Sequence, residues 1–137
     1  RLALVQGVKD GLIDVIVSDH LPEDEESKRL PFAQAATGAV GVETLLPLSL
    51  EMYHNDSIPL NKIIEALTIN PAKILKIKKG SLTKGSDGDI CILDLEAPWA
   101  VRADKLKSKS RNTAIEGRTL QGKVLMTFLN GQLAFNQ

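Results

Sequence analysis

Hydrophobic spacing at the start of the chain predicts a helix followed by a buried strand. The apolar face of the predicted helix has the spacing of about 3.6 residues that a helix requires, and it is formed by Leu2, Val5, Val8 and Leu12. From Ile13 to Val17 the chain is almost continuously apolar. A parallel strand that is covered on both faces has such a run rather than an alternation. We therefore expect one central parallel strand over residues 13–17.

The middle of the chain predicts helices. An apolar face that includes Leu45 and Met52 predicts a helix that begins near Val42 and ends at residues 53–56, and a second helix is expected over Leu60–Leu67. Asparagine caps helices and proline suits their first turn, so Asn70-Pro71 predicts the start of a short helix over residues 72–77. His54 is expected on the surface at the end of the first of these helices.

The second half of the chain predicts strands and turns instead. Asp89–Asp94 is typical of a strand, and Gly122–Leu129 and Gln132–Phe135 are two more. Asn130-Gly131 between the last two favours a type I′ hairpin turn. The two halves therefore have different architectures, α/β and then β, with a boundary at residues 78–80.

Composition narrows the class of protein. Seventeen basic and seventeen acidic residues cancel, so the chain lacks the charge excess that attracts nucleic acid or anionic membranes. A small neutral metabolite or another protein is the expected partner. No apolar stretch is as long as a membrane span. Cys91 is the single cysteine and is expected to be a buried strand residue, so a reducing compartment, the cytosol, is the expected location.

Asp19 and His20 are the candidate reactive groups. They directly follow the predicted strand, and in α/β barrels the catalytic groups lie at the C-terminal ends of the strands. The alternative is structural: Ser18 or Asp19 only caps a turn before Pro22. The residues that follow favour the catalytic interpretation.

Five stretches resemble, in order and spacing, the C-terminal part of the dihydroorotases. The resemblance is carried by residues 13–22 (Ile-Asp-Val-Ile-Val-Ser-Asp-His-Leu-Pro), 41–48 (Gly-Val-Glu-Thr-Leu-Leu-Pro-Leu), 70–75 (Asn-Pro-Ala-Lys-Ile-Leu), 85–90 (Gly-Ser-Asp-Gly-Asp-Ile) and 108–113 (Ser-Lys-Ser-Arg-Asn-Thr), with Gly117. The first and third occur widely in cyclic amidohydrolases. The second and fifth are more specific to dihydroorotases.

The resemblance implies a metal-dependent (β/α)8 barrel with a small β-sandwich. Such a barrel needs about 250 residues, so residues 1–78 are expected to be the last barrel strand and its helices, and residues 79–137 the C-terminal strands of the sandwich. The implied cofactor is zinc, and most of its ligands, including a His-x-His pair, would lie upstream. The implied reaction of pyrimidine biosynthesis interconverts N-carbamoyl-L-aspartate and L-dihydroorotate. The chain by itself is expected to be an inactive fragment.

The resemblance also assigns site residues. Asp19 would be the catalytic proton acceptor and a metal ligand, and His20, Glu23, Thr37 and Gly38 would bind substrate. Two departures concern the substrate. Leu21 and Glu23 stand where the family commonly has alanine and histidine, and Ala36-Thr37-Gly38 stands where Pro-Phe-Gly is usual. A carboxylate at residue 23 would repel a dianionic substrate.

Two other functions stay open from sequence. One is a catalytically silent dihydroorotase homologue that serves as a structural partner of aspartate carbamoyltransferase. The other is a hydantoinase or allantoinase, which the tract 108–113 fits poorly. Retention of Asp19 favours the enzyme. A homodimer is also open.

Overall fold

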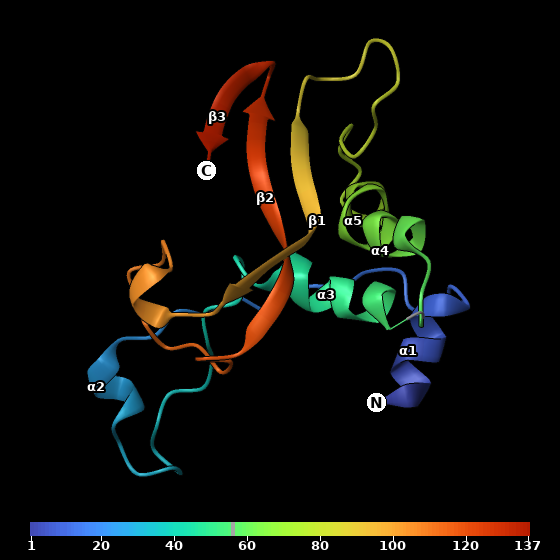
Figure 1. Ribbon diagram of the computed structural model, residues 1–137. Helices are drawn as coiled ribbons and strands as arrows, with labels where there is room; N and C mark the ends of the chain where they lie inside the picture. Colours follow the sequence, from blue (N-terminus) through green and yellow to red (C-terminus); the bar gives the residue numbers. More distant parts are fainter. Residues whose placement is uncertain (56) are drawn as a thin grey trace.

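The computed structural model describes residues 1–55 and 57–137. Asp56, the last residue of one expected helix end, lies outside them. The element order is α1 (Leu2–Lys9), α2 (Glu25–Lys28), α3 (Leu45–His54), α4 (Leu60–Leu67), α5 (Ile69–Ile74), β1 (Ile90–Ala100), a short 3-10 helix (Ala103–Lys105), β2 (Thr119–Leu129) and β3 (Gln132–Asn136). Helix α4 contacts α1, α3 and α5, and α3 contacts β2 (Figure 1). The expected change from helices to strands is present.

The three strands form one antiparallel sheet in the order β1-β2-β3. Leu129 pairs with Gln132 across the turn between β2 and β3. Asn130 and Gly131 have φ values of 51° and 77°, and a type I′ turn needs a positive φ at both positions. The expected hairpin is confirmed.

Strand β1 is longer than expected. It continues beyond Asp94 to Ala100, and from Leu93 onward half-buried and exposed residues alternate. The register with β2 shifts between Asp94 and Pro98. The Asp94 carboxylate accepts the backbone N–H groups of Glu96 and Ala97, which satisfies donors at this bulge. The sequence did not predict this extension, because it contains acidic residues and a proline, and proline in a sheet is confined to edges and bulges.

The core lies where α3 crosses the sheet. The largest fully buried side chains are those of Leu50, Ile58, Ile63, Val101 and Leu120. Helix α3 approaches β2 closely at Gly122, which has a φ of 105°. A Cβ atom at this position would lie 2.5 Å from Cδ1 of Leu50, so only glycine fits.

The expected strand over residues 13–17 is not paired as a strand within the described part of the chain. Its backbone is held instead by α4 and α5: Ile16 N–H donates to the Ala66 carbonyl, and the Asn70 amide donates to the Asp14 carbonyl. A central parallel strand pairs with a neighbour on each side, and the described residues supply only one bridge, between His20 and Ala39.

Asn70 therefore does not cap a helix. Helix α5 begins one residue before it, at Ile69, and its first flanking residue is Thr68, whose side chain makes no capping hydrogen bond. Pro71 lies in the first turn, as expected. The sequence signal located the turn correctly but assigned the wrong role to the asparagine.

Two expectations about burial were wrong. Cys91 is exposed, because this end of β1 extends beyond the part of the sheet that α3 covers (Figure 1). His54 does end α3, but its side chain is only 16% exposed, and its Nε2 is buried without a hydrogen-bond partner among the described residues.

Residues 75–89 connect α5 to β1, and an ion-pair cluster fixes their end. Lys79 pairs with Asp87 and Asp89, and these carboxylates raise the pKa of the Lys79 ammonium. The pKa of Asp89 is lowered, first by the hydrogen bond from the Asn130 backbone N–H and second by the hydrogen bond from Lys79. The cluster therefore joins the connection to the hairpin turn.

Candidate active site

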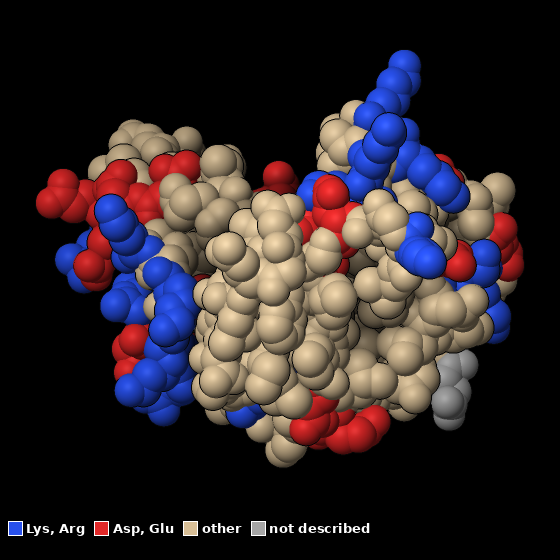
Figure 2. Space-filling view, turned by 90° about the horizontal axis from the view of Figure 1, so that it is seen from above, with Lys and Arg blue, Asp and Glu red and all other residues tan. Residues whose placement is uncertain are grey.

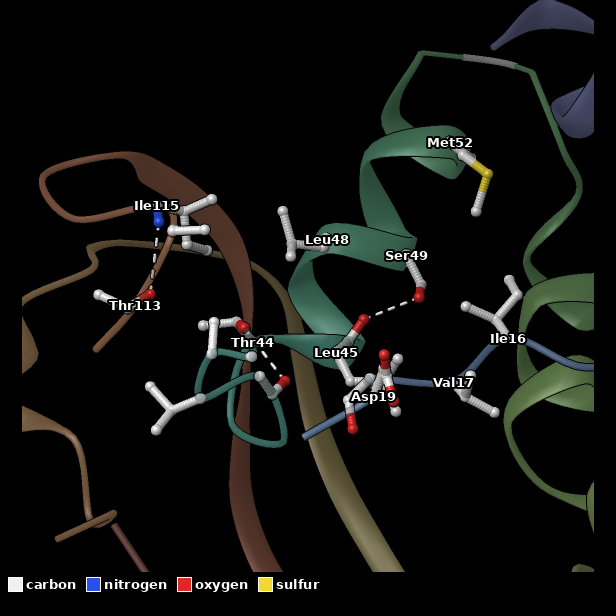
Figure 3. A pocket seen from close by; sticks show the side chains of 16 residues that line it. Ile16, Val17, Asp19, Thr44, Leu45, Leu48, Ser49, Met52, Thr113 and Ile115 are labelled. Carbon is white, nitrogen blue, oxygen red and sulfur yellow. Dashed lines mark hydrogen bonds between the residues drawn. The ribbon is translucent and has the colours of Figure 1, made fainter. Parts of the chain in front are cut away.

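Asp19 lines an open cavity of about 600 Å³ beneath α3. Figure 3 shows Asp19 below this helix, near Leu45 and Val17, with Thr113 and Ile115 on the far side. The residue is exposed and has a φ of 46°, a left-handed conformation that is uncommon outside glycine. Such backbone strain concentrates at functional sites, so the observation agrees with a role for this carboxylate.

His20 faces a different direction. Its Nδ1 accepts the backbone N–H groups of Gly41, at 3.0 Å, and Val42, at 3.3 Å. An accepting Nδ1 places the proton of a neutral imidazole on Nε2. His20 lines a small cleft with residues 40–44 and Leu106, rather than the cavity of Asp19. The side chain holds the segment before α3 in place.

Gly38 is the second expected site residue that lines the cavity. Its φ is 115°, and a Cβ atom here would lie 2.7 Å from the Leu21 carbonyl oxygen. The next residue, Ala39, forms the bridge with His20, and its carbonyl accepts the Leu21 N–H. Asp19 and Gly38 are thus brought together because two backbone segments run side by side without room for a side chain at residue 38.

Glu23 and Thr37 do not line the cavity that the described residues form. Glu23 is half-buried, and its carbonyl accepts the Ser110 hydroxyl at 2.7 Å. Thr37 is exposed. Of the five expected site residues, Asp19 and Gly38 therefore line the cavity, and the other three do not.

Sequence reasoning missed the residues that hold this loop. Lys28, the last residue of α2, donates to the carbonyls of Ala36 and Gly38. Asn112 donates to the Gly38 carbonyl at 2.7 Å. Glu43 accepts the backbone N–H groups of residues 107 and 108. In the sequence, the signal for Lys28 was a basic residue that closely follows the acidic residues 23–26.

The described residues do not fit a complete metal site. A catalytic zinc needs three protein ligands, and no group of three His, Cys, Asp or Glu side chains in this part of the chain could hold a metal. Asp19 supplies one carboxylate at the cavity. The zinc that the resemblance implies therefore needs ligands from outside these residues.

The face seen in Figure 2 gives little sign of a polyanionic partner. Figure 2 shows one face with a broad uncharged area, at whose margins basic and acidic side chains lie close to one another. Nucleic-acid sites instead concentrate basic side chains on one face. None of the helices that the structure describes has the length and apolar character needed to cross a membrane.

Curated relatives match almost the whole chain. It is 44% identical over 135 residues to a dihydroorotase of Ehrlichia chaffeensis, covering 98% of this chain and 30% of that protein. The dihydroorotase of a Wolbachia of Brugia malayi is 43% identical over 137 residues (100% and 31%), and that of Aquifex aeolicus is 42% identical over 135 (98% and 32%). The chain thus spans about a third of the length of these relatives.

Solved structures share the fold. An L-hydantoinase (dihydropyrimidinase) of Arthrobacter aurescens superposes with a TM-score of 0.91 at 30% identity, over 97% of this chain and 31% of that one. A dihydropyrimidinase of Brevibacillus agri gives 0.93 at 22% identity, over 98% and 31%. The amidohydrolase family model matches residues 1–134. Because this model covers almost the whole chain, and the relatives and the shared fold agree with it, the chain belongs to the amidohydrolase family.

Proposed function

We propose that this chain supplies the last part of the active site of a dihydroorotase. The observation that carries the proposal is the position of Asp19 on the cavity wall beside Gly38, in a chain 44% identical to a curated dihydroorotase. The reaction is the reversible closure of N-carbamoyl-L-aspartate to L-dihydroorotate. The hydantoinase alternative has less support, since the L-hydantoinase structure is 30% identical.

Asp19 is the proposed proton acceptor. In the hydrolytic direction, its carboxylate takes a proton from the attacking water and returns it to the amide nitrogen as the ring opens. Its exposure to the cavity and its fixed backbone suit this exchange. We also propose that Asp19 is one ligand of a zinc ion whose other ligands lie outside this chain.

Residues 20–38 form the proposed substrate loop. Gly38 and Thr37 would bind a substrate carboxylate through backbone N–H groups, which do not depend on side-chain identity. His20 orients the segment that precedes α3. Glu23 would oppose an anionic substrate, so its proposed effect is unfavourable.

The apolar face of α1 would contact other parts of the barrel. Leu2 and Leu4 in this helix are 84% and 65% exposed, and Leu12, three residues after its end, is 81% exposed. Exposed apolar area of this kind is typical of surfaces that bind protein, and the relatives are about three times as long as this chain. We propose that the remaining barrel covers it.

Replacing Asp19 with asparagine in the full-length protein tests the function. The amide keeps the shape of the carboxylate but cannot accept a proton at neutral pH. We expect dihydroorotate hydrolysis to fall by about 10² to 10⁴-fold. Asp14→Asn is the matched control, because Asp14 is exposed and does not line the cavity, and it should leave turnover within about twofold.

Retention of more than about a third of the turnover by Asp19→Asn would show that Asp19 is not the base. Thermal unfolding of both variants checks that the fold is intact. A folded wild-type protein without any turnover would instead favour the silent homologue that partners aspartate carbamoyltransferase.

A further inference from the structure

Asn112 holds the loop segment Gly38–Val40 at two points. Its side-chain amide donates to the Gly38 carbonyl at 2.7 Å, and its own backbone carbonyl accepts the Val40 N–H at 2.8 Å. The two bonds lie on either side of Ala39, which forms the bridge with His20. Asn112 comes from the connection between β1 and β2, 93 residues after Asp19 in the chain.

Fixing the Gly38 carbonyl also fixes the neighbouring N–H. The peptide unit is planar and trans, so the carbonyl of Gly38 and the N–H of Ala39 point in opposite directions. One side of this peptide faces Asn112, and the other faces the chain segment that carries Asp19. Lys28 acts at the same place, through the carbonyls of Ala36 and Gly38.

The tract 107–113 has further contacts with the site. Ser110 donates to the Glu23 carbonyl, and Glu43 accepts the N–H groups of residues 107 and 108. Thr113 lines the cavity itself. The tract therefore contacts the loop, the segment before α3 and the cavity wall, although it lies in the strand-forming half of the chain.

We propose that Asn112 is a positioning residue that sets the geometry of the substrate loop against Asp19. It acts through the Gly38–Ala39 peptide and does not contact substrate. Residues 37 and 38 directly precede this peptide, so the strand-forming half of the chain thereby sets where their N–H groups lie and how well they bind the substrate carboxylate. This proposal rests on the proposed dihydroorotase function.

The test compares Asn112→Ala and Asn112→Asp in the full-length protein. Aspartate keeps the size of asparagine but loses the donor and places a negative charge against the Gly38 carbonyl. We expect both to raise KM for dihydroorotate by about tenfold while kcat changes less than about threefold. Asn136→Ala, on the exposed strand β3, is the control and should change neither.

Amide hydrogen exchange supplies a readout that is independent of activity. We expect faster exchange at residues 36–40 in both Asn112 variants, with unchanged exchange in β2. Unchanged KM together with unchanged exchange would overturn the proposal. A fall in kcat together with a loss of exchange protection across the whole chain would also overturn it, because that pattern indicates general destabilisation. A wild type without turnover contradicts the proposed function; in that case loop exchange alone decides whether Asn112 positions the loop.

Discussion

Asp19 and His20 are adjacent in sequence but have different environments. The Asp19 carboxylate lines the cavity, whereas the His20 imidazole accepts backbone N–H groups of residues 41 and 42. The left-handed backbone of Asp19, with a φ of 46°, lies at the point where the two directions diverge. Residue type alone indicated chemistry at this pair, but only the backbone conformation separates a reactive group from a structural one.

Glu23 is the residue whose charge is expected to reduce substrate affinity. In the full-length protein, Glu23→Gln removes the charge at nearly constant size, and Glu23→His also adds a donor. A like charge near a partly solvated site costs about 1 kcal/mol. We therefore expect KM for N-carbamoyl-L-aspartate to fall about fivefold for glutamine and about tenfold for histidine.

Steady-state kinetics in the synthetic direction measures this effect. Glu26→Gln, an exposed change three residues further on in α2, controls for general charge. If neither Glu23 variant changes KM, the carboxylate faces solvent, in agreement with its position outside the described cavity wall.

At the scale of elements, hydrophobic spacing and turn residues correctly predicted the features that depend on residues close together in sequence. Helix α4 has the expected bounds, Leu60–Leu67, and the hairpin turn lies at Asn130-Gly131. The expected strand at residues 13–17 and the role of Asn70 were wrong, because strand pairing and the contact between Asn70 and Asp14 depend on residues distant in sequence.

Gly122 is predicted to limit the packing of α3 on the sheet. Gly122→Ala places a methyl group 2.5 Å from Cδ1 of Leu50, a side chain that is fully buried. We expect a loss of about 3 kcal/mol in the free energy of unfolding, from overpacking and from the strained φ.

Gly85→Ala separates the two causes. Gly85 has a similar φ of 93°, but no atom lies within 4 Å of the position that an alanine methyl group would occupy, so only backbone strain of about 1 kcal/mol is expected. Urea denaturation of both variants measures the difference. Equal losses would mean that α3 shifts freely and that Gly122 is not a packing constraint.

The whole molecule combines one wall of a site with large uncovered apolar surfaces. The matched relatives are about three times longer than this chain, and the described residues include no group of three metal-ligating side chains that could hold a metal. We therefore expect the 137-residue chain on its own to bind no stoichiometric zinc and to have no dihydroorotase turnover.

Metal analysis after dialysis against zinc measures the first expectation, and hydrolysis of dihydroorotate the second. The full-length protein, treated in the same way, is the control. One tightly held zinc per chain, or turnover above background, would contradict the idea that the remaining ligands lie elsewhere.

The sequence by itself determined the change from helices to strands, helix α4, the hairpin and the position of Asp19 after an apolar run. These follow from local periodicity and turn chemistry, and the resemblance indicated the family that the comparisons then showed. Only the tertiary structure decided that Asp19 and Gly38 share a cavity, that His20 faces backbone, and that Asn112 holds the loop. Those contacts join residues up to 74 positions apart, and hydrophobic spacing carries no information about such pairs.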